Sequence, residues 1–576
     1  MWRKALRAGL IILSILATIK ICILSLGIDE EYAVAMSYRI ASGDLMFREM
    51  WEPHQTSGFL SAFLIRIFLL VTGGTDYLII YLRLCGCFLQ FLISILLYKS
   101  TKRHFHPDAC FLAAVFFYNT LPKWIQTPEF SNMLIWFSVL AFICFLRYFF
   151  PIKVKEGINT GSFLWLIGAG VSVSCLVLSY PSCVFAVPVF LLCMWMCRAG
   201  QKPRFKTYCQ QAGIFLGTCV ALGGAYVLYF LRQMSIQDFY YGLSQMMTDG
   251  AHSTAFYVKL LIWGQELLGL LPHVLIAVIP AAVLSFTVSK LRALNISLVI
   301  SLCIAFGEQM VIWLGNSEYL QRPLIYFYVL YIGGYWIYLY YFKNNSERHK
   351  GIHSFLFWMG VVAGGAVWLS ALAITNTTVS VTGPYLMIGL ISAILLISES
   401  FSNMPVELKK VGLKLEALAA LFLIGTTLFA KGFLVCSNEG YKDTVGMVRQ
   451  KALYGPAKGI YCRYMDGYTL NRYAELLEQA SIEHKRVLYV GVHSLIYLYG
   501  EQVICNYSTI STPTFDERLK DYWERNPEKQ PELVICGSSE ESLEEIRQII
   551  SLGEELTEAV ILEDQSQIKI FTVAEY

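Results

Sequence analysis

Three consecutive acidic residues follow the first long apolar stretch of the sequence. Asp29, Glu30 and Glu31 come directly after the stretch from Ala5 to Leu26. If that stretch crosses a membrane, the carboxylates lie where water meets apolar walls, and a partly desolvated carboxylate can serve as a general base. The alternative is that these acids only mark the outer end of a membrane helix. The sequence therefore offers Asp29 and Glu30 as candidate catalytic residues.

A single arginine interrupts the next apolar stretch. Arg83 lies several residues inside Leu78 to Tyr98, and a charge within a membrane span is costly unless it is paired. We expect one of two roles for it. It forms a structural salt bridge with Asp76 or with an acid of the first loop, or it contacts a substrate.

The composition shows what must position these residues. Hydrophobic residues make up 56% of the chain and charged residues 15%, which a soluble protein of this length could not cover with a polar surface. About thirteen apolar stretches recur from Ala5 to about Leu434, most of them near the length that spans a bilayer. The first follows Arg3, Lys4 and Arg7 and lacks a cleavage site, so we expect a retained anchor. The sequence predicts an all-α polytopic membrane region over residues 1–434.

The connecting loops alternate in charge. One set is rich in Lys and Arg, and the other holds most of the acids and few cations. By the positive-inside rule the basic loops face the cytoplasm, so the N-terminus is cytoplasmic and an odd number of spans places the C-terminal end outside. The basic loops contain Lys99, Lys102, Arg103, Lys153, Lys155, Arg198, Lys202, Arg204, Lys206, Lys290, Arg292, Lys343, Arg348, Lys350, Lys409, Lys410 and Lys414.

Residues 435–576 are more polar and predict a small extracytoplasmic α/β domain. Short β-rich runs alternate with amphipathic helices, which favours a partly parallel sheet. No G-x-G-x-x-G follows a strand, so no nucleotide site is assigned. The predicted strands are Arg486 to Val492, Glu532 to Cys536, Val560 to Leu562 and Ile568 to Val573, and the predicted helices are Phe515 to Asn526 and Glu540 to Leu552. Four cysteines fall here, Cys436, Cys462, Cys505 and Cys536, and their pairing cannot be deduced.

A compound motif in the first loop resembles a known superfamily. Its parts are Asp29-Glu30-Glu31-Tyr32, Ala41-Ser42-Gly43-Asp44, Trp51-Glu52-Pro53-His54-Gln55, the apolar segment Phe59 to Val71, which we expect to be an interfacial helix, and then Arg83. This order and spacing resemble the first outer loop of the GT-C glycosyltransferases, especially protein O-mannosyltransferases and lipid A aminoarabinose transferases. The resemblance extends to Thr127-Pro128-Glu129-Phe130 and, more weakly, to Glu318-Tyr319-Leu320-Gln321-Arg322-Pro323.

The resemblance implies inverting transfer of a sugar from a polyprenyl-phosphate donor to a lipid, glycan or protein acceptor at the outer face. In a single displacement, a base must take the proton of the acceptor hydroxyl while the phosphate departs on the opposite side. Asp29 is the predicted base. Glu30 and Glu129 would orient this site, bind the acceptor or hold a divalent cation, although no metal is assumed.

Cations should stabilise the negative charge that grows on the departing phosphate. The predicted substrate-binding residues are Arg48, His54, Arg83, His252 and Arg322, and Lys123 and Lys259 are further outward-facing cations. For each of the loop cations, snorkelling to lipid headgroups is the alternative. One departure concerns Glu52, which stands where the family has a cation before its prolines, so His54 is the expected substitute.

Other functions remain open at this stage. A transporter or flippase of a lipid-linked or small solute should show paired halves or polar residues at the bilayer midplane, whereas the polar residues here cluster at one face. A polysaccharide polymerase or ligase would favour arginines in its outer loops. The net charge of +3 gives no indication of nucleic-acid binding, and the outer domain would cap the active site, receive the acceptor or act as a scaffold.

Overall fold

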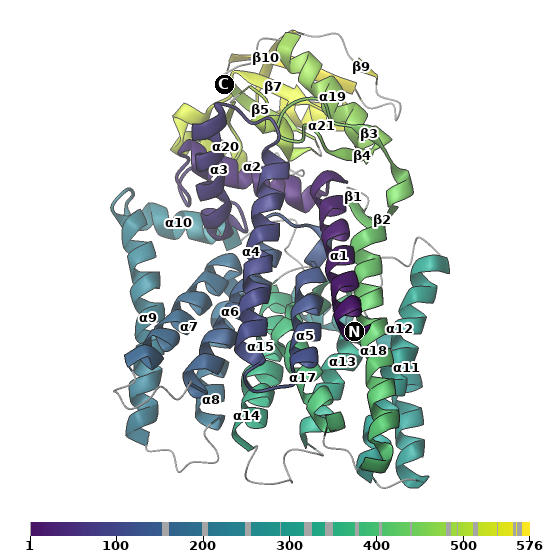
Figure 1. Ribbon diagram of the computed structural model, residues 1–576. Helices are drawn as coiled ribbons and strands as arrows, with labels where there is room; N and C mark the ends of the chain where they lie inside the picture. Colours follow the sequence, from purple (N-terminus) through teal and green to yellow (C-terminus); the bar gives the residue numbers. More distant parts are fainter. Residues whose placement is uncertain are drawn as a thin grey trace.

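The computed structural model describes the whole chain except residues 1, 152–159, 198–204, 248–254, 288–289, 316–324, 340–349, 375–378, 403–405, 438–439, 480–484, 492, 501, 511–516, 538–539, 557–559, 562–566 and 576. Figure 1 shows a bundle of helices with a group of strands at one end. The helices of the bundle are α1 (Trp2–Ile23), α2 (Ile28–Ser42), α3 (Phe59–Thr72), α4 (Leu78–Thr101), α5 (Pro107–Asn119), α6 (Phe130–Phe149), α7 (Thr160–Ser179), α8 (Val187–Met196), α9 (Phe205–Leu231), α10 (Ile236–Met247), α11 (Phe256–Thr287), α12 (Lys290–Gly315), α13 (Ile325–Ile337), α14 (Lys350–Phe355), α15 (Ala363–Ile374), α16 (Val379–Thr382), α17 (Met387–Ser402) and α18 (Val406–Phe433).

The bundle has the lengths and apolar composition of membrane-spanning helices. Seven described helical segments are long and apolar enough to cross a bilayer, and five shorter apolar helices accompany them. Helices suit this role because every backbone polar group is satisfied inside the segment. The prediction of a polytopic helical membrane protein is confirmed, while the number of about thirteen spans stays a prediction.

The outer loops are more helical than the sequence analysis assumed. The apolar segment after the proline motif forms α3, and together with the preceding turn η1 (Gln55–Gly58) it is itself long enough to be a candidate span. Its placement along the membrane surface stays a prediction. The sequence predicts a second long outer loop from Arg232 to about Leu270, but α10 forms within this range and α11 already begins at Phe256.

Strands begin at Leu434, directly after α18. The strands are β1 (Leu434–Ser437), β2 (Gly440–Thr444), β3 (Val448–Lys451), β4 (Tyr461–Arg463), β5 (Arg486–Val490), β6 (Val503–Ile504), β7 (Leu533–Cys536), β8 (Ser551–Glu555), β9 (Val560–Ile561) and β10 (Gln567–Glu575). The largest sheet has the order β6-β5-β7-β10-β8, with β9 also paired to β10. Strand β5 is parallel to β6 and β7, whereas β10 is antiparallel to its neighbours. The predicted partly parallel α/β region is confirmed; the domain boundary itself stays a prediction.

The two faces of this sheet bury different partners. On β5, Val487 and Tyr489 join a core shared with residues of α2, α3 and α4. The alternate residues Leu488 and Val490 join a second core with α20 (Glu517–Arg525) and α21 (Glu540–Arg547). Because side chains alternate across a strand, burial on both faces requires the continuous apolar run seen at β5. The sheet therefore packs directly on the helices that follow the first span.

Candidate active site

The three acids of the first loop lie in the first turn of α2. This helix runs from Ile28 to Ser42, and Gly43, which follows it, has a left-handed φ of 113°. Acidic side chains in a first turn interact favourably with the positive end of the helix dipole. Consecutive residues of a helix are rotated by about 100°, so the three carboxylates point in different directions. Each meets a different basic residue: Asp29 meets Lys123, Glu30 meets Arg83 and Glu31 meets His493.

Asp29 is the acid of this turn that remains partly open. Its carboxylate lies 2.8 Å from the ammonium of Lys123, and the Asp29 and Lys123 side chains are 39% and 11% exposed. Lys123 belongs to the turn η2 (Pro122–Trp124) and has a left-handed φ of 55°. Burial lowers the pKa of Lys123, but the electrostatic interactions with Asp29, Tyr385 and Glu129 and the hydrogen bond to Asp29 together outweigh burial and raise that pKa above its ordinary value. The pair thus keeps a cation beside a carboxylate that solvent still reaches.

Glu129 lies beside this pair and caps α6. Its carboxylate accepts backbone N–H bonds from Ser131 at 2.8 Å and Asn132 at 2.7 Å, which satisfies free donors at the helix start. The side chain is almost fully buried. Burial raises the pKa of Glu129 to about 7, although the charge of Lys123 opposes that shift. Glu129 therefore both fixes the start of α6 and titrates near neutral pH.

Aromatic rings form one wall of the candidate site. The ring of His54 stacks on Phe130 with centroids 4.0 Å apart and planes 8° apart, and Lys123 Nζ lies 4.9 Å from the centroid of the same Phe130 ring. The ring centroids of Tyr180 and His54 are 5.4 Å apart, and the Tyr385 hydroxyl donates to Ser131 Oγ at 2.8 Å. The structure therefore brings His54, predicted as a substrate contact, to the same place as Asp29 and Glu129.

Arg83 is held by protein groups on every side of its guanidinium. It pairs with Glu30 through Nε at 2.8 Å and Nη2 at 2.5 Å. It also donates to the carbonyls of Ile21, Leu24 and Ser25 at the end of α1. A guanidinium has five N–H donors, and these five bonds join α1, α2 and α4. Of the two roles left open by the sequence, this geometry is that of a structural salt bridge with an acid of the first loop.

The remaining predicted substrate contacts are not gathered here. Arg48 is exposed, and its carbonyl accepts from Asn526 Nδ2 at 3.2 Å in the C-terminal region. His252 and Arg322 lie outside the described residues. Within the described part of the chain there is no group of three or more His, Cys, Asp or Glu residues that could hold a metal ion. The substrate-binding roles of these residues stay predictions.

No family model matches this sequence, and no curated protein matches it. Solved structures that resemble the chain include ArnT from Cupriavidus metallidurans in the apo state, with a TM-score of 0.48 and 10% identity over 98% of this chain and 97% of that one. The oligosaccharyltransferase of Archaeoglobus fulgidus has a TM-score of 0.47 and 11% identity over 98% of this chain and 73% of that one. ArnT from Cupriavidus metallidurans bound to undecaprenyl phosphate has a TM-score of 0.44 and 11% identity over 99% of this chain and 98% of that one.

These likenesses concern overall shape. The function proposed below rests on this chain's own residues.

The structure shows why residue 52 is an acid here, where the resembling families have a cation. It is fully buried and accepts from Ser508 Oγ and from the Thr509 N–H, both at 2.6 Å, with Arg39 Nη1 at 3.5 Å. Burial raises the pKa of Glu52, opposed by Arg39 and these two hydrogen bonds. Its carboxylate thus binds the first loop to the C-terminal region, rather than facing the Asp29 site.

Arg39 sits at the centre of this contact. It also bonds Asp44 Oδ2 at 2.7 Å and the Asn506 carbonyl at 2.7 Å, and Lys529 bonds the other Asp44 oxygen at 2.5 Å. We call this cluster the junction: Arg39, Asp44, Glu52, Asn506, Ser508, Thr509 and Lys529.

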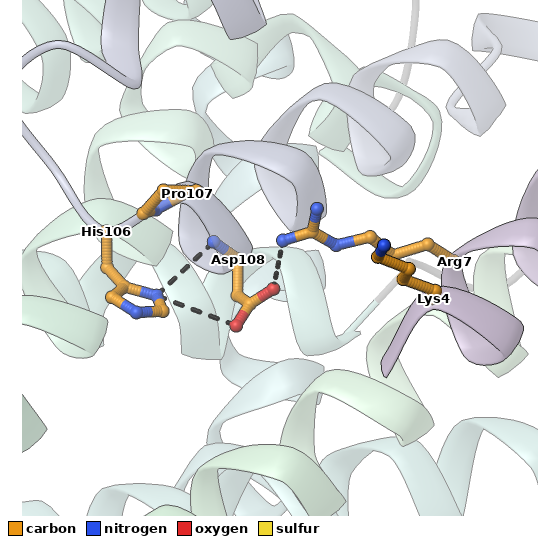
Figure 2. A pocket seen from close by; sticks show the side chains of 5 residues that line it. All are labelled: Lys4, Arg7, His106, Pro107 and Asp108. Carbon is orange, nitrogen blue, oxygen red and sulfur yellow. Dashed lines mark hydrogen bonds and ion pairs between the residues drawn. The ribbon is translucent and has the colours of Figure 1, made fainter. Parts of the chain in front are cut away.

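A separate polar hollow lies far from Asp29. It measures about 270 Å³ and is lined by Lys4 and Arg7 of α1 with His106, Pro107 and Asp108 at the start of α5 (Figure 2). Arg7 pairs with Asp108, whose N–H donates to His106 Nδ1 at 3.3 Å. Helix α4 connects the two places. Before its first residue, Tyr77 N–H donates to the Gly455 carbonyl in the C-terminal region, and its 24 residues span about 36 Å before the chain reaches α5. The hollow is therefore a membrane thickness away from the candidate site.

Two residues that contact the acids of α2 are not predicted from the sequence. Lys123 is expected only as an outward-facing cation without an assigned role, and no motif indicates His493. The partners in the Glu31 and His493 pair are 462 positions apart. Nothing in the local pattern around either residue indicates the other.

Proposed function

We propose that this protein is a membrane glycosyltransferase that moves a sugar from a polyprenyl-phosphate donor to an acceptor hydroxyl at the outer face, with inversion at the anomeric carbon. The observation that carries the proposal is the arrangement of Asp29, a partly exposed carboxylate at the end of the first span, against Lys123, whose side chain is 11% exposed. A base and a cation within one site are what such a displacement requires.

Asp29 acts as the general base in this scheme. The acceptor oxygen bonds to the anomeric carbon while the bond from that carbon to the phosphate oxygen breaks. The acceptor's proton passes to Asp29, and the polyprenyl phosphate leaves with one additional negative charge. Asp29 lies against Lys123 and its side chain is 39% exposed, so its carboxylate is accessible to an acceptor that arrives from solvent.

Lys123 stabilises the departing phosphate. Its ammonium lies next to Phe130 and Asp29, and an ammonium in a site with little water interacts strongly with developing charge. Glu129 adds a further charge that acts on Lys123 and fixes the start of α6, which carries Phe130. His54, stacked on Phe130, completes the wall against which the donor's phosphate or sugar would lie.

The proposed orientation follows from the charge pattern of the loops. The C-terminal region lies at the end of the bundle where α1 ends and α2 begins, since Ser25 N–H donates to the Tyr461 carbonyl of β4 at 2.6 Å. With basic loops in the cytoplasm, this end is outside. A lipid-borne donor would reach Asp29 from the bilayer, and the acceptor would arrive from the exterior.

A transfer assay tests the proposal. Membranes holding the full-length chain or Asp29→Asn are supplied with a panel of radiolabelled polyprenyl-phosphate sugars. We expect wild-type transfer and a loss of about 10²-fold or more with Asp29→Asn, the range for a general base. Asp76→Asn is the matched control, because Asp76 is another outer acid but bonds Lys458 and Gly455.

Two results would contradict the proposal. Equal turnover by wild type and Asp29→Asn would remove Asp29 from the mechanism. Solute uptake by purified protein in liposomes, without any sugar transfer, would favour the transporter.

A further inference from the structure

A buried contact joins the C-terminal region to the first turn of α2. His493 Nδ1 lies 3.1 Å and 3.3 Å from the two oxygens of Glu31. The His493 and Glu31 side chains are 4% and 0% exposed. A carboxylate oxygen accepts hydrogen bonds, so this geometry suits donation from a protonated Nδ1 of His493. A buried charge of this kind must have a partner, and for Glu31 that partner comes from a separate region of the chain.

His493 is itself held firmly. It follows the carboxyl end of β5, the edge of a parallel sheet where α/β folds place functional side chains. Its N–H donates to the Tyr489 hydroxyl at 3.3 Å. Burial lowers the pKa of His493, but the charge and hydrogen bond of Glu31, with the charge of Asp466, outweigh burial and raise that pKa. The histidine is therefore a fixed donor rather than a mobile surface group.

Glu31 is only two residues from Asp29 on the same helical turn. On another side of that turn, Glu30 is fixed by Arg83 of α4. The direction in which Asp29 leaves α2 thus depends on two buried pairs, one to the membrane bundle and one to the C-terminal region. In a displacement reaction, a misplacement of about 1 Å can reduce the rate about 10²-fold.

We infer that His493 is a positioning residue for the transfer site: by binding Glu31 it fixes the first turn of α2 and with it the Asp29 carboxylate. The C-terminal region then serves the reaction as part of the frame of the active site and not only as a cap. This inference rests on the proposed function, because Asp29 is the base whose position is being set.

The test compares variants of the full-length protein that differ only in this contact. His493→Asn keeps an N–H donor near the place of Nδ1, and His493→Leu removes it. Glu31→Gln/His493→Leu removes both the donor and the buried charge. Lys458→Gln is the matched control, because Lys458 also joins the C-terminal region to the membrane part, through Asp76 at 2.6 Å. For each, kcat, the KM for the polyprenyl-phosphate sugar and the thermal midpoint are measured.

We expect His493→Leu to lower kcat at least about 10-fold with the donor KM within about threefold, since misplacement acts on the chemical step and not on donor binding. His493→Asn should retain kcat within about threefold, and Lys458→Gln should match wild type. Glu31→Gln/His493→Leu should fold as wild type does yet keep the low kcat. If His493→Leu does not fold, the double variant and His493→Asn still provide the comparison.

Two outcomes would overturn the positioning role while leaving the proposed function intact. One is wild-type kcat in His493→Leu while Asp29→Asn is inactive. The other is recovery of kcat in the double variant, which would show that His493 only neutralises a buried charge. Absence of transfer by the wild-type protein would instead refute the proposed function, and the positioning role with it.

Discussion

The junction and the Asp29 site are both built from charged residues of the first loop, but they differ in exposure. At the junction, Arg39 and Glu52 have side chains that are 0% exposed and are bonded on several sides. At the site, Asp29 lies beside Lys123 and its side chain is 39% exposed. Buried charges that are bonded on several sides hold two regions of the chain together, whereas a carboxylate that solvent reaches is accessible to a substrate. Four predictions test this distinction, beginning with the largest effect.

Arg39→Met should destabilise the protein most. It leaves Glu52 buried without its cation and leaves Asp44 with Lys529 as its partner, and breaking a buried pair in this way costs about 3–5 kcal/mol. Thermal or denaturant unfolding of the purified protein measures the loss. Adding Glu52→Gln should recover part of it. An Arg39→Met protein as stable as wild type would show that the junction is not what binds the C-terminal region to the bundle.

Lys123→Met should act on catalysis rather than folding. Removing one preorganised group that stabilises developing charge costs about 10²-fold to 10³-fold in kcat, while the partly exposed Asp29 can be solvated by water. Transfer kinetics and the unfolding midpoint together separate the two effects. Loss of stability comparable to that of Arg39→Met, with kcat preserved among the folded molecules, would place Lys123 with the structural charges.

Glu129→Gln should change the pH dependence of stability. The pKa of Glu129 is raised to about 7 in the folded protein, above its value in an unfolded chain of about 4.3. The folded state therefore binds more protons between these values, and wild-type stability attributable to this group falls as the pH rises from about 4.5 to about 7. The thermal unfolding midpoint of Glu129→Gln minus that of the wild type should therefore increase as the pH rises over that range. A constant difference from pH 5 to pH 8 would contradict the raised pKa.

Lys458→Gln should have the smallest effect. Lys458 and Asp76 form an exposed pair with side chains 33% and 51% exposed, and exposed pairs contribute little to stability. We expect no measurable change in unfolding midpoint or transfer. A clear loss of either would show that contacts outside the junction and the Glu31 pair also hold the C-terminal region in place.

The features that could be predicted from the sequence are those encoded within one segment. Runs of apolar residues predicted the membrane helices, and β-rich runs predicted β5, β7, β9 and β10 within a few residues. The acids after the first span predicted a polar site at the start of α2. Each of these depends on hydrophobicity or periodicity along neighbouring residues, which a single sequence carries.

Only the tertiary structure determines which partner each acidic residue of the first loop has. Asp29, Glu30 and Glu31 are alike in sequence, yet they face Lys123, Arg83 and His493 in turn, and Glu52 joins Ser508 and Thr509, more than 450 positions away. Such pairings depend on how distant elements pack, and no local pattern specifies them. Burial and partner, not residue type, distinguish the buried Glu30, Glu31 and Glu52 from the partly exposed Asp29.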